Sequence, residues 1–406
     1  MRKPSELPSL GPAAPGDLYG KLVCRSSSFR RHPIGTVVVK VASRCNLACT
    51  YCYMYQMADR SWLGQPRFIG VETLHTLGER LADYAGQRAL PSVTVVAHGG
   101  EPLLMGAVRL REFLAVIDAS LRQSGCTPHL GVQTNGTLID DEFVDLFREY
   151  EVGVGVSLDG PITAHDRYRV DKHGKGSSSA TLRGISGLRG TTRDKHAIGG
   201  MLSYAHIDCQ PGEFLTFFTE LRIDNLDVLF PDFNHDTIPA SYREGALARW
   251  MIELFDLWIE GSDELEIRTF AVIMHLLLGG RFGYESFGAN SLGVLVVETD
   301  GGYHASDTLK SSYDGVTATG MNVLRHEIRE VEEFPLVRAA SSKAVSAAAE
   351  CLACPIFDVC GGGLLAHRYS AKRGFDQPSV YCEDIQAIVG HIRGRIAREV
   401  PARWMR

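Results

Sequence analysis

The most regular feature of the chain is an alternation of short apolar, β-branched runs with longer amphipathic runs, which starts at Thr36. Runs of the first kind are typical of buried strands, and periodic apolar positions in the longer runs predict helices. Strands that alternate with helices favour an α/β fold with a parallel sheet. We count six such units, with strands expected at residues 36–41, 92–97, 130–134, 152–158, 197–204 and 227–230.

The same pattern predicts how the chain divides into domains. Six units are too few for a closed eight-stranded barrel, and residues 36–262 are expected to form the first domain. Residues 263–290 read as a helical linker. The sequence pattern that follows predicts a hairpin with its turn at Asp300 and Gly301. A second domain is therefore expected at 291–406. The proline-rich residues 1–35 read as a disordered tail and lead-in.

Composition and charge narrow the class of protein. Hydrophobic residues make up 45% and charged residues 22% of the 406 positions, which is ordinary for a globular protein. The net charge of −6 and the lack of a long basic run argue against nucleic-acid binding, because that needs a basic footprint. No run is long and apolar enough for a membrane span or a secretion signal, which predicts a cytoplasmic protein. Ten cysteines in such a chain indicate metal ligation rather than disulfides.

Three of these cysteines stand close together in the sequence CNLACTYC, at Cys45, Cys49 and Cys52. Thiolates this close can converge on one metal centre. An iron-sulfur cluster normally takes four cysteines, so three ligands leave one iron free to bind a small molecule. The alternative is a zinc knuckle, although zinc pairs are usually C-x2-C.

The C-x3-C-x2-C spacing, with Tyr51 before the last cysteine and Tyr53 after it, resembles the radical S-adenosylmethionine (SAM) superfamily. That resemblance implies a partial (β/α)6 barrel with its site at the carboxyl ends of the strands. It also implies a 4Fe-4S cluster whose open iron binds SAM, with Tyr51 among the residues at the cofactor. Cleavage of SAM then gives a 5'-deoxyadenosyl radical.

Further motifs follow the second, third and fourth expected strands. In HGGEP two glycines let the backbone approach a ligand closely, and the resemblance implies that Gly100 and Glu101 hold the SAM amino group. QTNG places Asn135 at the barrel mouth, although either this motif or SLDGP could merely be a turn. The resemblance further implies that Ser157 of SLDGP contacts SAM and that Arg169, twelve positions later, contacts its carboxylate.

A second group of cysteines near the C-terminus has a different spacing. Four thiolates with no open position indicate a structural or electron-relay centre, and four-cysteine zinc is the alternative. The spacing resembles the SPASM domain of radical SAM enzymes that modify peptides. Because Leu364 stands where a further ligand would lie, we expect one auxiliary 4Fe-4S cluster rather than two. Its ligands would be Cys351, Cys354, Cys360 and Cys382.

A narrower resemblance is carried by VVETDG (296–301), SDTLK (306–310), CGGGLLAHRYS (360–370) and FDQPSVYCEDI (375–385). Together these motifs resemble the FxsB-type radical SAM/SPASM maturases, which install cyclophane crosslinks in ribosomally made peptides. The resemblance implies removal of a β-hydrogen and attack of the carbon radical on an aromatic ring. It implies two partners, a precursor peptide and an electron donor such as flavodoxin or ferredoxin.

Several points stay open on the sequence alone. Ring closure also requires loss of an electron and a proton. The auxiliary cluster is a candidate acceptor for the electron, and Asp232 or His235 is a candidate acceptor for the proton. The precursor could dock by adding a strand to the hairpin at 292–304. Thioether formation, epimerisation and formylglycine formation are alternative reactions. A noncatalytic iron-sulfur electron carrier or a zinc-bound peptide-binding module is the alternative of another class.

Overall fold

The computed structural model describes residues 33–189, 198–261, 265–282, 284–289 and 293–399. Most of the tail predicted at 1–35 lies outside the described residues, as does Cys24. The description that follows concerns the described part of the chain.

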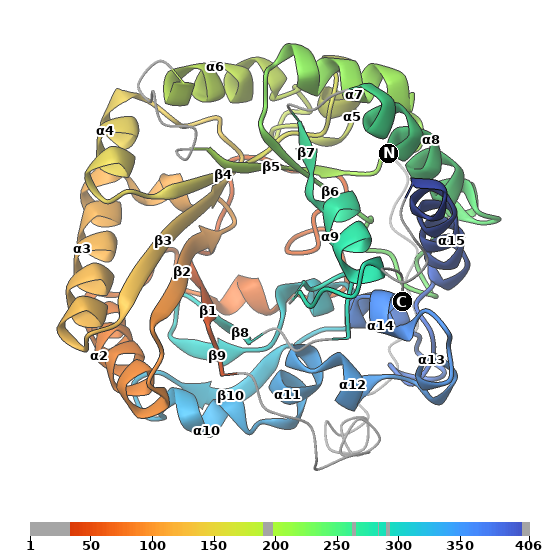
Figure 1. Cartoon of the computed structure of the whole chain (residues 1–406). Helices are drawn as coiled ribbons and strands as arrows, with labels where there is room; N and C mark the ends of the chain where they lie inside the picture. The colour runs from red at the N-terminus through yellow and green to blue at the C-terminus, as the bar shows by residue number, and fades with distance from the viewer. Residues whose placement is uncertain (1–32, 190–197, 262–264, 283, 290–292, 400–406) are drawn as a thin grey trace, which may run out of the picture.

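One curved sheet organises the molecule, with strand order β10-β9-β8-β1-β2-β3-β4-β5-β6-β7 (Figure 1). From β1 to β6 the strands are parallel neighbours in chain order, for example with Val38 opposite Val96. The six expected strands are therefore confirmed. Their bounds are β1 Thr36–Ala42, β2 Ser92–Gly99, β3 Thr127–Thr134, β4 Gly153–Ser157, β5 Ile198–Tyr204 and β6 Asn225–Leu229.

Helices cover the outer face of this sheet (Figure 1), and apolar side chains of its strands are buried in the core. Local sequence sets their starts: the Asp140 carboxylate caps α4 by accepting from the Phe143 N–H at 3.1 Å. The helices are α2 Val71–Arg88, α3 Ala107–Gln123, α4 Asp141–Glu149, α5 Ile162–Tyr168, α6 Ser178–Arg189, α7 Pro211–Glu220 and α8 Ala246–Gly261. Short 3-10 helices are η1 Ser61–Gly64, η2 Pro102–Met105 and η3 Ala240–Tyr242.

The segment predicted as a helical linker also contributes to the sheet. It contains the helix α9 Arg268–Leu277, but just before it the strand β7 Glu266–Ile267 pairs with β6. The linker prediction is therefore wrong at this point. Two residues are too few to show the period-2 alternation that identifies a strand.

The hairpin expected after residue 291 is present as β8 Val294–Val297 and β9 Gly302–His304, with Gly301 at φ +82° in the turn. However, β8 also pairs in parallel with β1, and β9 pairs with β10 Ala318–Asn322. Both edges of the hairpin are occupied, so the expected docking of a peptide strand onto it is wrong.

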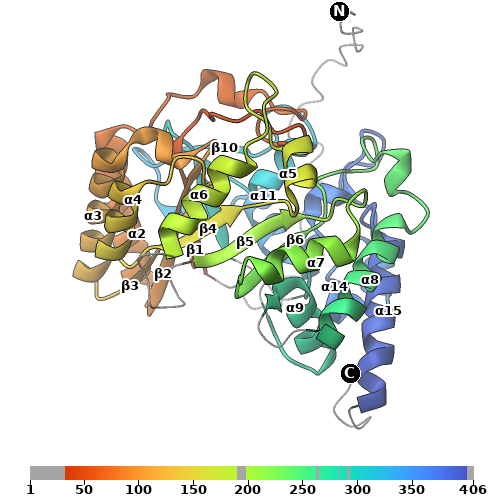
Figure 2. The same cartoon turned by 90° about the horizontal axis from the view of Figure 1, so that it is seen from above.

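The remaining elements follow the hairpin and form the C-terminal part of the molecule. Helix α15, Cys382–Glu399, lies along α8 (Figure 2), and its Asp384 carboxylate accepts from the Ala248 N–H at 2.8 Å. The others are η4 Asp307–Ser311, α10 Ile328–Glu332, α11 Pro335–Ser341, α12 Lys343–Ser346, α13 Ala349–Leu352, α14 Phe357–Cys360 and η5 Leu365–Arg368. The domain boundary stays a prediction, because the sheet runs through it.

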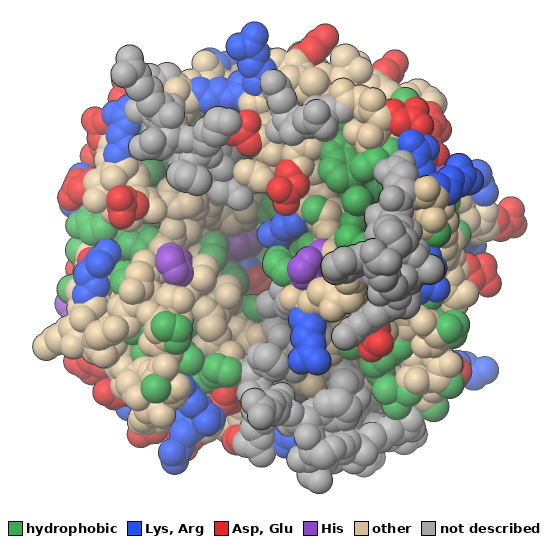
Figure 3. All heavy atoms as spheres, viewed as in Figure 1, with side chains coloured by type: hydrophobic (Ala, Val, Ile, Leu, Met, Phe, Trp, Pro, Cys, Tyr) green, Lys and Arg blue, Asp and Glu red, His purple; other side chains and the backbone are tan. Residues whose placement is uncertain are grey.

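Acidic and basic side chains are interspersed on the face shown in Figure 3, which carries no continuous basic surface. Within the described ranges, no helix combines the length and apolar character needed to span a bilayer.

Candidate active site

A cavity of ≈ 280 Å³ opens at the carboxyl ends of the strands. Most of the predicted site residues line it, from the cysteine loop, β3, β4 and the segment after α5. They are Cys45, Cys49, Tyr51, Cys52, Gly100, Asn135, Ser157, Arg169 and Asp232. Glu101 and His235, also predicted, are not among its lining residues.

The cysteine loop joins β1 to η1 and holds its thiols in a turn. The Cys52 N–H donates to the Cys49 carbonyl at 3.2 Å, and the Leu47 N–H donates to Cys45 Sγ at 3.4 Å. Burial raises the pKa of Cys45 to about 12 and that of Cys52 to about 11. Thiols this hard to ionise become thiolates when a metal coordinates them. The donor set fits an iron-sulfur cluster better than it fits free nucleophilic cysteines.

Gly100 is a glycine for a reason that differs from the expected one. A Cβ here would lie 2.0 Å from Tyr55 Oη and 2.5 Å from the Arg44 backbone carbon. The small residue therefore lets β2 and the cysteine loop pack together, and does not primarily clear space for a ligand. The Gly100 N–H donates to the Ala42 carbonyl at 2.9 Å, which fixes the same contact.

Glu101 is fully buried, and its carboxylate already has three donors. It accepts from the Leu103 N–H at 3.0 Å, Thr134 Oγ1 at 2.7 Å and the Asn135 N–H at 2.8 Å. Burial raises its pKa to about 7 despite these bonds. These contacts tie the end of β2 to the end of β3 and hold Asn135 at the cavity. A direct bond from Glu101 to the SAM amino group stays a prediction.

Arg169 is buried, with 8% of its surface exposed, rather than solvated on the surface. Its Nε lies 3.0 Å from Asp159 Oδ1, and its guanidinium carbon lies 5.5 Å from the centre of the Tyr51 ring. Asp159 also accepts from Tyr51 Oη at 2.5 Å and lies 3.1 Å from His206 Nε2. Asp159 therefore fixes both Tyr51 and Arg169 at the cavity wall.

The predicted proton acceptors lie in different places. Asp232 lines the cavity, accepts from Tyr204 Oη at 2.5 Å, and has its pKa raised to about 7 by burial. His235 instead contacts the Pro378 carbonyl through Nε2 at 2.9 Å, and its N–H donates to the Tyr369 carbonyl. Of the two candidates, the structure favours Asp232.

His98, which precedes the two glycines, also lines the cavity. Its Nδ1 accepts from the Gly99 N–H at 2.7 Å and from Lys40 Nζ at 3.0 Å, while the competing Gly99 carbonyl lies at 3.1 Å. Two donors against one acceptor favour the tautomer that carries its proton on Nε2. Burial lowers the pKa of His98 to about 3, so the ring is a neutral donor.

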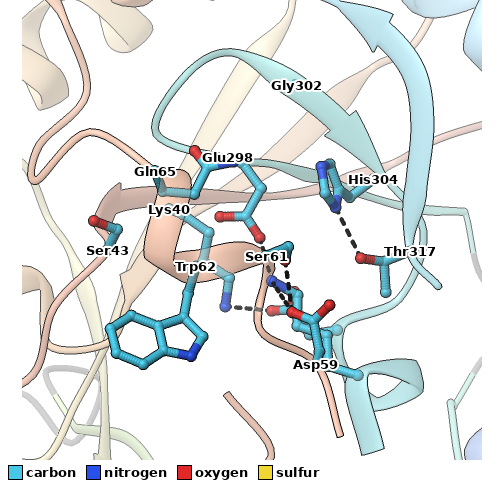
Figure 4. Close-up of polar contacts among 12 residues, drawn as sticks. Lys40, Ser43, Asp59, Ser61, Trp62, Gln65, Glu298, Gly302, His304 and Thr317 are labelled. Atoms are coloured by element: carbon cyan, nitrogen blue, oxygen red, sulfur yellow. Dashed lines mark hydrogen bonds and ion pairs between the residues drawn. The ribbon is translucent and has the colours of Figure 1, made fainter. Parts of the chain in front are cut away.

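Lys40, which contacts His98, belongs to a buried set of charges that connects the cysteine loop to the C-terminal part of the chain (Figure 4). Lys40, at the end of β1, pairs with Asp307, and Lys310 Nζ lies 2.6 Å from Glu298 and 3.8 Å from Asp59. The Asp59 N–H also donates to the Lys310 carbonyl at 3.1 Å. The motifs VVETDG and SDTLK thus supply the groups that hold both ends of the loop.

The C-terminal cysteines surround a second cavity of ≈ 220 Å³. Cys351, Cys354, Cys360 and Cys382 all line it, although they come from three different helices and a connecting turn. Arg368 braces this region by donating to the carbonyls of Phe375 and Gln377. Leu364 lines the first cavity instead.

Two further cysteines lie outside both clusters. Cys126 and Cys209 are buried away from both cavities, with 3% and 7% of their surfaces exposed. Among the described residues, no three His, Cys, Asp or Glu side chains are arranged to share one metal ion. The ligand roles of all seven clustered cysteines therefore stay predictions.

Comparison with known proteins places this geometry in a family. The model of the radical SAM superfamily matches residues 39–202, which run from within β1 to within β5 and include the cysteine loop. The chain belongs to the radical SAM superfamily. It is accordingly an oxidoreductase-type enzyme whose cofactors are a 4Fe-4S cluster and SAM. The three thiols, the open cavity and the polar groups of Asn135, Ser157 and Arg169 fit these cofactors.

Two curated relatives match parts of this radical SAM chain. One is the serine-type anaerobic sulfatase-maturating enzyme of Bacteroides thetaiotaomicron, 30% identical over 56% of this chain and 58% of that enzyme. The chain thus spans little more than half of that relative. The other is an uncharacterized protein of Methanothermobacter thermautotrophicus, 34% identical over 57% of this chain and 82% of the relative.

Among solved structures, native anSMEcpe with bound AdoMet and the Cp18Cys peptide has a similar fold. Its TM-score is 0.76 at 22% identity, and the match covers 90% of this chain and 98% of that chain. The likeness extends beyond the radical SAM barrel into the C-terminal part, and it concerns the fold.

Sequence reasoning missed several residues that shape the site. Asp159 stood inside SLDGP but looked like a turn residue, and only its neighbours in space reveal its bonds to Tyr51 and Arg169. His98 stood beside a recognised motif and could have been found from its position at a strand end. Lys40 gave no signal, because lysine in a strand is ordinarily exposed.

Proposed function

We propose that this enzyme is a maturase that forms a carbon-carbon crosslink between a β-carbon and an aromatic side chain of a ribosomally made peptide. The observation that carries the proposal is the pair of cysteine-lined cavities, with a buried carboxylate, Asp232, on the wall of the first. A peptide-modifying reaction agrees with the named relatives. The crosslink itself rests on the motifs shared with the FxsB-type family.

Each group at the first cavity has a part in this reaction. When bound, the cluster and SAM supply a 5'-deoxyadenosyl radical that removes one hydrogen atom from the peptide. Cys45, Cys49 and Cys52 would hold the cluster, and Asn135, Ser157 and Arg169 would orient SAM. Arg169 is already positioned by its pair with Asp159, so little freedom is lost when SAM binds.

Asp232 would accept the proton that leaves the aromatic ring. Its pKa of about 7 suits a base at neutral pH, because a base works best when its pKa lies near the operating pH. Tyr204 orients the carboxylate through its hydroxyl at 2.5 Å. Tyr51, Tyr204 and Phe230 surround the site with rings that limit the access of water.

The second cysteine group would hold one auxiliary 4Fe-4S cluster, which agrees with the four thiols around one cavity. Ring closure releases an electron as well as a proton, and this cluster would take up the electron. The partners would be the precursor peptide and a reducing protein such as flavodoxin or ferredoxin. The cytoplasm suits such partners.

Formylglycine formation is the second candidate, because a curated relative is a sulfatase-maturating enzyme. Mass spectrometry distinguishes crosslink formation from formylglycine formation. The sample is a small peptide that is encoded beside the gene and coexpressed with the enzyme. A crosslink removes two hydrogens and blocks fragmentation between the joined residues. Formylglycine gives an aldehyde that reacts with a hydrazide. An aldehyde product, or an unmodified peptide from an enzyme that cleaves SAM, would contradict the crosslink.

A further inference from the structure

Between the two cavities lies a buried lysine that the proposed reaction does not use. Lys343, the first residue of α12, is 9% exposed, and its Nζ has no hydrogen-bond partner among the described residues. A buried ammonium without a hydrogen-bond partner is strongly unfavourable. Such a group persists when something at the site compensates its charge.

The surroundings of Lys343 show where that compensation would come from. A space of ≈ 10 Å³ beside it is also lined by Glu285, Thr308 and Leu364, and these three residues line the first cavity as well. On its other side the Cys360 thiol acts on it electrostatically. The lysine therefore lies between the wall of the first cavity and the C-terminal cysteines.

The chain also packs tightly around the stem of this lysine. A Cβ at Gly361, which has φ +65°, would lie 2.1 Å from the Gly288 carbonyl oxygen and 2.7 Å from Lys343 Cδ, so the absence of a side chain here leaves room for the lysine stem. The neighbouring cation, Arg368, is bonded to backbone carbonyls and is thereby satisfied. Lys343 Nζ forms no hydrogen bond among the described residues, and its charge interacts only through space with Cys360 and Glu285.

We propose that Lys343 is the countercation of the iron-sulfur centre at Cys351, Cys354, Cys360 and Cys382 and raises the reduction potential of that centre. The inference rests on the auxiliary cluster in the proposed function. A centre with four thiolates is anionic and gains one more negative charge on reduction. A fixed positive charge nearby stabilises the reduced form more than the oxidised form.

The test is a redox titration of the reconstituted full-length enzyme, followed by electron paramagnetic resonance without peptide. The neutral variants Lys343→Met and Lys343→Gln should lower the potential of the auxiliary centre. Lys343→Arg should keep it near the wild-type value, because the charge is retained. Lys372→Met, an exposed lysine beyond the same glycine loop, is the matched control and should leave the potential unchanged.

Iron content decides the remaining outcomes. If the neutral variants lose the irons of this centre while Lys343→Arg keeps them, the charge is required and the inference stands. Equal potentials in wild type and neutral variants with full iron would overturn it, as would loss of iron in Lys343→Arg as well. Zinc in the C-terminal site of the wild type would instead remove the auxiliary cluster from the proposed function.

Discussion

Asp232→Asn gives a direct test of the carboxylate that is proposed to act as base. Asparagine has the shape of the protonated acid and can still accept from Tyr204 Oη, so the change removes only the ability to ionise. Burial raises the pKa of Asp232 from an ordinary 3.8 to about 7. That difference corresponds to about 4 kcal/mol, an upper value because the cavity admits water.

The direction in which stability changes with pH follows from proton linkage. Between the two pKa values the folded protein holds a proton that the unfolded chain has lost, so the stability of the wild type falls as pH rises. The variant has no such penalty. Asp232→Asn should match the wild type near about pH 4 and become progressively more stable relative to it up to about pH 7. Glu101 has a similarly raised pKa, but its effect on stability is the same in both proteins and cancels in the difference between them.

The assay is anaerobic unfolding of both proteins at several pH values, together with product analysis. Asp232→Asn should keep SAM cleavage and lose most peptide modification. Tyr204→Phe removes a hydrogen bond that favours the ionised carboxylate and so raises the folded-state pKa further. The divergence should still begin near about pH 4 but extend to higher pH and become larger. A stability difference that stays constant with pH would refute the reasoning, because the carboxyl would then have an ordinary pKa.

Three further predictions concern other parts of the site. Gly100→Ala should displace the cysteine loop at a cost of about 1–3 kcal/mol in stability and reduce the iron bound by the three cysteines. Gly64→Ala should keep the full iron content, because nothing lies within 4 Å of the added carbon. Asp159→Ala should destabilise the fold by about 3–5 kcal/mol, because Arg169 is left buried and unpaired. The control Asp145→Ala removes an exposed ion pair with Arg148 and should cost less than about 1 kcal/mol, so equal losses of stability would contradict the argument. Alanine at the four C-terminal cysteines should leave about half of the iron and retain SAM binding, while Cys126→Ser should keep all of it; unchanged iron in the first variant would disprove the ligand assignment.

The parts of the fold that could be predicted are those with a local signal. The strands β1 to β6 are runs of apolar and β-branched residues, and the cysteine triad lies within one loop of eight residues. Such features depend on neighbours in the sequence. The position of Gly100 was found for the same reason, although its steric role was misread, because a motif does not show what the glycine faces.

The features that were missed depend on contacts between distant segments. The pairing of β8 with β1 joins residues more than 250 positions apart, and no periodicity encodes it. Asp159 and Lys343 have roles set by neighbours that the chain brings together only in three dimensions. His235 was a candidate because it follows β6, but the loop turns its ring toward Pro378.

The pairing of β1 on both sides has a consequence for biosynthesis. While the ribosome is producing the first 290 or so residues, β1 has β2 beside it but lacks β8, and the cysteine loop lacks Asp307 and Lys310. An unpaired edge on an apolar strand invites aggregation during synthesis. The SAM-cluster loop is held at both ends only after these later residues emerge, so iron-sulfur assembly factors meet a finished site after translation of the C-terminal part. The barrel expressed alone should therefore be both aggregation-prone and poor in iron.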